Sequence, residues 1–359
     1  MSDSPKEAEE KMKKAIFISA DCWLCVFDLL SPRQFGLGIA LISRRFDYYV
    51  DEHFKTRKWA LKFIRIRGKI GESGTKKMKI VNSRWKPMPI PKIQFPRKVI
   101  GFKCIEIKYI DRNTIAFLHR FRQLFAKCSI NLFIWAKNDR ILEFILRNIW
   151  PMFGKSIHGM ALSVTVFHRL RKFAPSFLNE CPLLRIVKFD ATADLFTEFP
   201  ADDSAAASDG QALAKWLFTP LQSNVPKVLK CWLDMDDVNL ASKLETFKSA
   251  FASASSPVNF IVVISFRSSS FAASVMSFDQ TNELTREQLA LKRINNSCHF
   301  LLIRCPIVRD ENKWTKWEEE AIGWQFNGQW NKIEIQIKNK LAIGDGLLNA
   351  TPGQSDRQK

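Results

Sequence analysis

Short strand-like apolar runs alternate with helix-like segments between residues 105 and 266, and this alternation limits the possible folds more than any other feature. The strand-like runs are IEIKYI, INLFIW, MALSVTVF, LRIVKFD, VLKCWLD and NFIVVISF. The helix-like segments between them include TIAFLHRFRQLFAK, DRILEFILRNIWPMFG and ALAKWLFTPL. Alternation of this kind is typical of an α/β fold, in which helices pack beside a sheet.

The spacing of these runs, roughly 25 to 45 residues, suits an irregular strand-helix solenoid of the leucine-rich-repeat kind. We assign residues 105–270 to this solenoid-like region. The regular Leu-x-x-Leu-x-Leu-x-x-Asn signature is missing, so a compact α/β domain with a mainly parallel sheet is the alternative. Both architectures offer a surface for binding rather than a defined catalytic pocket.

Residues 271–348 have a different pattern, with several predicted strands and one predicted helix, and we expect a small α+β region there. LALKRI, FLLIRCPI and NKIEIQI are predicted strands, and DENKWTKWEEEAIGW is a predicted helix with Asp310 as its cap. One face of this helix carries regularly spaced apolar residues, namely Trp314, Trp317, Ala321 and Trp324. We expect that face to pack inward, because aromatic residues that stack on bases usually lie on strands in a basic groove.

The segment ISADCWLCVFDLL, residues 18–30, has the periodicity of a helix. Trp23, Phe27 and Leu30 recur at i, i+4 and i+7. Ser19 is a suitable N-cap for this helix, and an acidic residue follows it in the first turn. We therefore expect a helix that begins just before Cys22.

The same helix contains the pair Cys22 and Cys25, which has the spacing of a redox or metal-binding motif. A structural zinc site normally needs four ligands, and no second C-x-x-C or H-x3-5-H pair is present. A thioredoxin-like pair lies between a strand and a helix start, whereas helical periodicity runs through both cysteines here. We interpret the spacing as incidental and expect no metal site.

Two more helices are predicted after this one. SPRQ places Ser31 at an N-cap and Pro32 at the first helical position, with Gln34 closing a capping box. SRRFDYYVDEHF, residues 43–54, is a third helical segment with an apolar face. Three short helices are too few to bury their own apolar residues well, so this unit needs a partner surface, which another protein or the rest of the chain would supply.

The stretch ISADCWLCVFDLLSPRQFGLGIALISRRFDYYV resembles an F-box, the helical module that docks on a Skp-type adaptor. The family positions fall on Asp21, Leu24, Phe27, Leu30, Leu37, Ile42, Ser43, Arg44 or Arg45, and Phe46. Ile18 and Ser19 stand where the family has a Leu-Pro start. VDEHFKTRKWALKFIRI, NDRILEFILRNIWP and WTKWEEEAI resemble a lineage-expanded group of F-box domain-containing proteins with long C-terminal regions, so the likeness covers nearly the whole chain.

The resemblance implies a non-catalytic, substrate-recruiting subunit of a cullin-RING ubiquitin ligase. An F-box-like module at residues 15–60 would bind the Skp-type adaptor, and through it a cullin, while the C-terminal region would bind a target protein. The adaptor-binding residues that the resemblance implies are Trp23, Leu24, Phe27, Leu30, Leu37, Ile42 and Phe46. Another enzyme would transfer the ubiquitin, so no cofactor is expected.

A basic, Gly- and Pro-rich connector or hairpin is predicted at residues 61–104, between the module and the solenoid-like region. Its basic patch consists of Arg65, Arg67, Lys69, Lys76, Lys77 and Lys79. The whole chain has a formal net charge of +19 and a pI near 9.7, which favours acidic partners. The alternative function is therefore a basic nucleic-acid-binding or scaffold protein, although the charge is spread along the chain and this alternative is not the favoured one.

Neither an active site nor a membrane anchor is expected. G-x-S-x-G and H-E-x-x-H are missing, and the histidines are scattered. The longest apolar runs are far shorter than the ~20 residues that cross a bilayer. Residues 1–14 are charged without an apolar core, which predicts a cytoplasmic and/or nuclear protein. We expect disorder at 1–14 and 349–359 and a mobile loop at 200–211.

Overall fold

The structure is a computed structural model, and its described residues are 18–28, 39, 42–56, 58–70, 76–81, 87–88, 99–190, 195–233, 240–266, 276–294, 298–344 and 347–348. The chain divides into two compact units, Met1–Trp59 and Ala60–Lys359. Each unit has a hydrophobic core of its own.

Two described helices, α2 (Ala20–Asp28) and α4 (Arg44–Thr56), form the smaller unit. The hydroxyl oxygen of Ser19 accepts a hydrogen bond from the backbone N–H of Cys22 at 3.3 Å, which confirms the predicted N-cap. Phe27 and Val50 are buried between the helices. The second predicted helix begins at Ser31, which lies outside the described residues.

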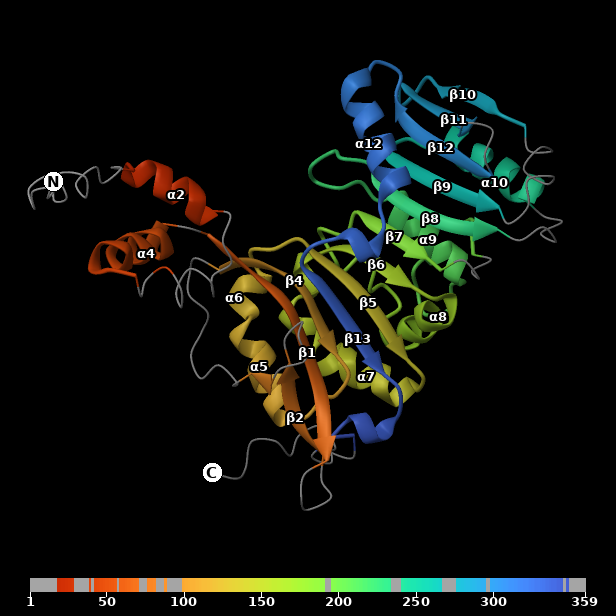
Figure 1. Ribbon diagram of the computed structural model, residues 1–359. Coiled ribbons are helices and arrows are strands. Elements are labelled where there is room, and N and C mark those ends of the chain that lie inside the picture. The colour runs from red at the N-terminus through yellow and green to blue at the C-terminus, as the bar shows by residue number, and fades with distance from the viewer. Residues whose placement is uncertain are drawn as a thin grey trace, which may run out of the picture. The chain divides into compact units, whose positions relative to one another are not determined.

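The larger unit is built on one sheet, which contains thirteen strands in the described part of the chain (Figure 1). Their order in the sheet is β10-β11-β12-β9-β8-β7-β6-β5-β13-β4-β1-β2-β3. The strands are β1 (Trp59–Ile70), β2 (Lys76–Val81), β3 (Pro87–Met88), β4 (Val99–Ile107), β5 (Ile130–Ala136), β6 (Ile157–Leu162), β7 (Ile186–Phe189), β8 (Lys227–Leu233), β9 (Phe260–Phe266), β10 (Phe278–Asn282), β11 (Glu287–Arg293), β12 (His299–Pro306) and β13 (Lys332–Ile337).

The central part of this sheet, from β4 through β13 and β5 to β9, is parallel. Antiparallel pairs flank it, with β12, β11 and β10 on one side and β1, β2 and β3 on the other. The expected α/β class with a large, mostly parallel sheet is thus confirmed.

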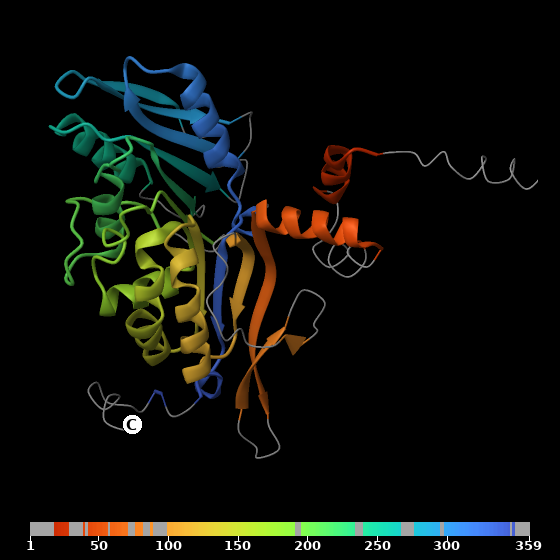
Figure 2. The ribbon, with the colours of Figure 1, turned by 90° about the vertical axis from the view of Figure 1, so that its left-hand side faces the viewer.

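Helices cover one face of the sheet, as the side view in Figure 2 shows. They are α5 (Arg112–Arg120), α6 (Arg122–Phe125), α7 (Asp139–Asn148), α8 (Val164–Phe173), α9 (Asp209–Leu217) and α10 (Leu240–Ala252). On the opposite face, α12 (Glu311–Gly323) covers β9, whose Ile261 and Val263 pack in the same cluster as the tryptophans of this helix. Their neighbour Val262 points to the other side and joins the main core, so β9 is buried on both faces.

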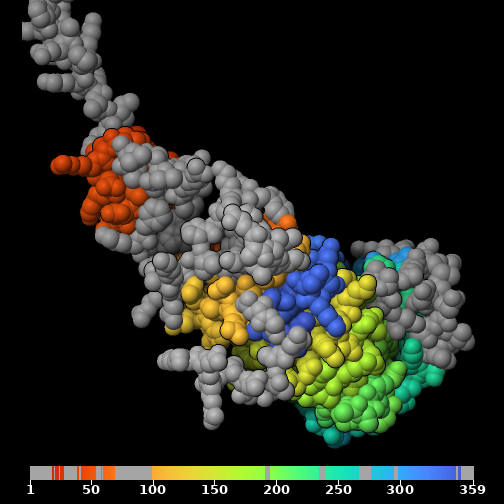
Figure 3. All heavy atoms as spheres, turned by 90° about the horizontal axis from the view of Figure 1, so that it is seen from below, coloured from red at the N-terminus to blue at the C-terminus, as the bar shows by residue number. Residues whose placement is uncertain are grey.

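Strand β13 lies between β4 and β5, although it follows them by about two hundred residues in the chain. Ile333 is the register partner of Ile105 on one side and of Leu132 on the other. Figure 3 shows the blue C-terminal segment between the yellow-orange and yellow segments. The α+β region predicted for residues 271–348 therefore shares its sheet with residues 105–266.

The predicted connector at residues 61–104 contains most of β1, all of β2 and β3 and the first part of β4, which corrects the idea of a simple linker there. Strand β1 buries Ile64 and Ile66 against the main core, because apolar residues alternate with polar ones along it. Strands β1 and β2 form an antiparallel hairpin. A hairpin was one of the two structures predicted for this segment, and an extended connector was the other.

The single strand predicted from MALSVTVF is also wrong in part. Strand β6 ends at Leu162, and α8 begins at Val164. Ser163 separates the two elements because its side chain accepts a hydrogen bond from the backbone N–H of Val166 at 3.2 Å, which caps the helix.

The loop at residues 200–211, which was predicted to be mobile, is held by hydrogen bonds. The guanidinium group of Arg171 donates to the carbonyl oxygens of Ser204 and Ala207, at 3.0 and 2.9 Å. The same group forms a 2.8 Å ion pair with Asp209. Small polar residues predicted mobility, but one buried arginine satisfies the backbone of this loop.

The C-terminal helix follows its prediction closely. The side chain of Asp310 accepts a hydrogen bond from the backbone N–H of Lys313 at 3.1 Å, so Asp310 is the N-cap of α12. Trp314, Ala321 and Trp324 are buried, and Trp317 packs beside them. The inward-facing tryptophan stripe is therefore confirmed.

Candidate interaction surfaces

Three residues of the implied adaptor set pack together in the smaller unit, with Phe27 buried and Trp23 and Phe46 partly buried. The ring centroids of Trp23 and Phe46 are 4.7 Å apart in an edge-to-face contact. Phe27 lies 6.1 Å from Trp23 and 6.4 Å from Phe46, and it is fully buried. Helical periodicity predicted that these residues share a face, and the structure brings them into contact with one another.

The exposed apolar residues of the smaller unit lie beside these core residues. Of the implied adaptor set, Ile42 is exposed within the described residues, with 62% of its surface accessible. Val26, next to Phe27, and Tyr48, next to Tyr49, are exposed as well. Val26 and Tyr48 were not predicted as exposed contacts, although consecutive helical residues point in different directions and their neighbours Phe27 and Tyr49 lie on the apolar faces.

The remaining members of the implied set are Leu24, Leu30 and Leu37. Leu30 and Leu37 lie outside the described residues, as does the side chain of Leu24. Cys22 and Cys25 are both free and exposed on α2. Among the residues that the structure describes, no group of three or more His, Cys, Asp or Glu side chains could hold a metal ion.

The backbone of the β1–β2 hairpin brings part of the predicted basic patch together. Arg67 is the register partner of Lys79, and Lys69 is that of Lys77. Lys76 is opposite Ile70. Like charges directly opposite one another destabilise a strand pair, so these positions call for an anion nearby.

Glu106 of β4 supplies such an anion for the arginines of the patch. Its carboxylate lies 3.2 Å from Arg65, 3.8 Å from Arg67 and 2.6 Å from Lys108. Both arginines therefore already face a carboxylate within the chain. This pairing reduces the attraction that Arg65 and Arg67 exert on an external phosphate.

Polar side chains continue across the neighbouring strands on the face away from α5–α10. Glu334 of β13 lies 3.4 Å from the amine of Lys332 and accepts a hydrogen bond from Gln336 at 3.3 Å. Trp135 of β5 is partly exposed on the same face. Figure 1 shows β13 and β5 turned toward the viewer with helices behind them. This part of the sheet carries charged and polar side chains beside the exposed Trp135.

Two buried lysines have strongly lowered pKa values, a property that often marks catalytic groups. Burial lowers the pKa of Lys227 to about 7 and that of Lys230 to about 8. The amine of Lys230 donates to the carbonyl oxygens of Ala321, Ile322 and Trp324, at 2.7, 2.7 and 3.1 Å. Lys230 thus caps the C-terminus of α12, and its burial has a structural explanation.

The amine of Lys227 donates to the carbonyl oxygen of Trp216 at the end of α9 and lies 5.0 Å from the centre of the Trp216 ring. Arg185 reaches α12 in a similar way, through a 2.8 Å ion pair with Glu320. These basic groups hold helices against the sheet.

None of the protein-family models, curated proteins and solved structures with which the chain was compared matches it. Within its described residues, the chain has no helix that is long and apolar enough to cross a membrane. A functional assignment therefore depends on the residues themselves and on their geometry.

Proposed function

We propose that this chain is a non-catalytic, substrate-recruiting subunit of a cullin-RING ubiquitin ligase, acting in the cytoplasm and/or nucleus. The F-box resemblance of residues 18–50 is the basis of the proposal. One observation of the structure supports it: α2 and α4 form a compact unit separate from the sheet, with a small core around Phe27 and Val50. Such a separate helical unit suits a docking module.

The surface of the smaller unit suits docking in a second way. Val26, Ile42 and Tyr48 leave apolar surface exposed on a unit that buries little of its own. An adaptor that covers these side chains would gain the free energy of apolar burial. We propose Ile42 and its exposed neighbours as adaptor contacts, with Trp23, Phe27 and Phe46 as the support beneath them.

The larger unit would bind the target protein in this proposal. Its strands from β4 to β9 follow one another across the sheet in chain order, interrupted only by β13. Helices between these strands lie on one side of the sheet (Figure 2). Both properties support our further proposal that residues 105–270 form an irregular, leucine-rich-repeat-like array. Its role in ubiquitination would be to raise the effective concentration of target lysines near the ubiquitin-loaded enzyme.

A binding assay with a purified Skp-type adaptor tests the proposal on the full-length chain. We expect the unchanged chain to retain the adaptor at moderate and at high salt, because an apolar interface depends weakly on ionic strength. The double variant Val26→Asp with Ile42→Asp should lose binding, since it places unpaired charges in the interface. Val308→Asp is the matched control, because Val308 is 91% exposed and belongs to the larger unit.

Circular dichroism of the double variant distinguishes a lost contact from a lost fold. The exposed positions should leave the helical signal unchanged, whereas Phe27→Asp, which buries a charge, should reduce it. Failure of the unchanged chain to bind the adaptor at either salt concentration would overturn the proposal. Equal binding by the unchanged chain and the double variant would mean that the adaptor contacts residues other than Val26 and Ile42.

The register of the β1–β2 hairpin favours a second candidate function, namely binding of nucleic acid. Two pairs of basic residues, Arg67 with Lys79 and Lys69 with Lys77, lie directly opposite each other. Affinity for an oligonucleotide should then fall steeply with salt, and Lys77→Gln with Lys79→Gln should reduce that dependence. The adaptor proposal predicts weak, unchanged binding in the same titration.

A further inference from the structure

A groove of about 240 Å³ opens on the helical side of the larger unit, between α7 and the segment that follows α8. Three aromatic side chains line it, namely Trp150, Phe173 and Phe177. Glu143, Arg147 and Glu180 bring charge to the same groove. The groove is far from residues 18–56 in sequence and belongs wholly to the sheet unit, so it plays no part in the adaptor proposal.

The aromatic walls of the groove are held in place by the core. The ring centroids of Trp150 and Phe177 are 6.0 Å apart, and their planes stand at 80°. Phe177 is buried against Phe167, with the two centroids 5.7 Å apart. A Cβ atom at Gly154 would lie 2.6 Å from the indole nitrogen of Trp150, so glycine makes room for the indole. These contacts fix the indole of Trp150 at one corner of the groove, while Phe177 itself is fully buried and offers a ligand no surface.

The third ring and the carboxylates lie around this corner. Phe173 is 38% exposed at the end of α8, which leaves part of its ring open to a ligand. Glu180 accepts a hydrogen bond from the hydroxyl of Ser176 at 2.9 Å. Glu143 forms a 2.7 Å ion pair with Arg147, one helical turn away on α7. Two carboxylates and one guanidinium give the groove a net negative charge, although the chain as a whole carries +19.

We propose that this groove binds a lysine or arginine side chain presented by a partner protein. Faces of aromatic rings attract cations, and carboxylates at the rim complement the same charge. The alkyl stem of a lysine or arginine would pack on the exposed parts of Trp150 and Phe173 while its charged head reaches Glu143 or Glu180. An aspartate or glutamate would be repelled, and an aliphatic side chain would gain nothing from the two carboxylates.

Arg147 is the internal competitor for such a cation. Its side chain is 60% exposed, and an exposed ion pair between residues four apart on a helix contributes little to stability. An incoming cation can therefore replace it beside Glu143. Removal of Arg147 should strengthen cation binding, a result that an aliphatic or anionic occupant does not predict.

Fluorine NMR of the full chain labelled with 5-fluorotryptophan tests the proposal. The Trp150 signal is assigned by its loss in Trp150→Phe, and the other tryptophan signals report whether each variant is folded. The probes are the acetylated amides of arginine, lysine, norleucine and glutamate. We expect the arginine and lysine amides to shift the Trp150 signal saturably, whereas the norleucine and glutamate amides leave it in place.

Variants sharpen the test. Glu143→Gln with Glu180→Gln should weaken binding of the arginine amide by on the order of tenfold, and Arg147→Gln should strengthen it about threefold. Glu319→Gln, an exposed position on α12, is the matched control and should change nothing. Equal shifts by the norleucine and arginine amides, no shift by any probe, or weaker binding by Arg147→Gln would each overturn the proposal.

Discussion

The two units of the chain differ in how completely they cover their own apolar residues. In the smaller unit, Phe27 and Val50 are the buried hydrophobic residues among those described, while Ile42 and Tyr48 are exposed. In the larger unit, every residue of β9 is buried, because helices cover one face of the sheet and α12 covers the other face of β9. The difference separates a unit with a small core and exposed apolar residues from one whose central strands are covered on both faces.

Chain length accounts for much of this difference. A unit of about sixty residues buries a smaller fraction of its surface than one of about three hundred, and its stability is correspondingly marginal. The smaller unit gains most from a bound partner, since binding to the folded state stabilises it by mass action. The larger unit tolerates buried charges, which a marginal unit does not.

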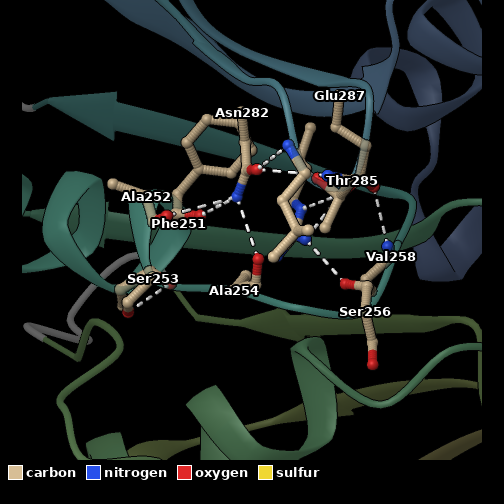
Figure 4. Close-up of polar contacts among 12 residues, drawn as sticks. Phe251, Ala252, Ser253, Ala254, Ser256, Val258, Asn282, Thr285 and Glu287 are labelled. Carbon is tan, nitrogen blue, oxygen red and sulfur yellow. Dashed lines mark hydrogen bonds and ion pairs between the residues drawn. The ribbon is translucent and has the colours of Figure 1, made fainter.

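An internal ion pair in the larger unit shows that tolerance. Arg304 and Glu287 are both fully buried and lie 2.6 Å apart. Glu287 also accepts a hydrogen bond from the backbone N–H of Val258 at 2.7 Å, and Arg304 donates to the carbonyl oxygen of Ser256 at 2.9 Å. Figure 4 shows Glu287 beside Val258, and Asn282 donating to the end of α10. These contacts tie the β10–β11 hairpin to α10 and to the segment that follows α10.

Breaking this network should give the largest effect on stability. Glu287→Ala leaves the Arg304 guanidinium buried without its carboxylate, and we expect the free energy of unfolding to fall by about 3–5 kcal/mol. Urea denaturation followed by tryptophan fluorescence measures the change. Glu283→Ala, an exposed position on the same hairpin, should change it by less than about 0.5 kcal/mol. Similar values for both variants would contradict a structural role for the ion pair.

The core of the smaller unit should be the next most sensitive place. Phe27→Ala removes a fully buried ring, which typically costs about 3 kcal/mol or more, although a marginal unit unfolds before the whole loss is measured. We expect rapid proteolysis within residues 18–56 while the sheet unit stays resistant. Tyr48→Ala, at an exposed ring on α4, is the control. Bound adaptor should slow the cleavage; simultaneous digestion of both units would show that they unfold together.

Local sequence signals predicted the elements of the larger unit well. The Asp310 cap and the buried Trp314 follow from a capping residue and helical spacing, both of which act within a few residues. The place of β13 did not follow, since its pairing joins Ile333 to Ile105 across more than two hundred residues. Alternation along a strand predicts which face is apolar, but it carries no information about which strand lies beside it.

For a related reason, the sequence predicted which residues of the implied adaptor set group together but not how far the smaller unit buries them. Periodicity groups Phe27 with Trp23 and Phe46, and the structure does bring these rings together. Periodicity does not reveal whether such an apolar face contacts the chain itself or a partner. The aromatic groove was missed altogether, because Glu143 and Phe177 are separated by a strand and a helix and meet only in the folded chain.

A substitution at the contact between α12 and the sheet tests how the larger unit covers the second face of β9. Lys230→Met removes the three hydrogen bonds to the helix C-terminus but fills a similar volume with an apolar chain. We expect a loss of about 1–2 kcal/mol, measured by urea denaturation. Lys316→Met, at an exposed position on α12, should have little effect. An unchanged variant would mean that the packing of Trp314 and Trp324 and the Arg185–Glu320 ion pair are enough to hold the helix.

The smallest expected effect concerns pH, and it belongs to the larger unit. Burial lowers the pKa of Lys227 from 10.5 to about 7, so between these values the unfolded chain binds more protons than the folded one. Stability should therefore rise with pH in this window, by about 1 kcal/mol from pH 7 to pH 8 for this one amine. Above pH 9 the trend should weaken, since burial raises the pKa of Cys104 and Cys181 to about 12 and the folded chain then binds more protons.

Lys227→Met isolates this contribution. The variant should be most stable relative to the unchanged chain at pH 6, and its advantage should shrink by about 1 kcal/mol for each pH unit as the pH rises above 7. Lys215→Met, at an exposed position on α9, should keep the full dependence on pH. Parallel stability curves for the unchanged chain and Lys227→Met would mean that Trp216 and its carbonyl hold the amine protonated in the folded state. The larger unit would then bury a charged lysine as well as an ion pair, and its contrast with the smaller unit would be sharper still.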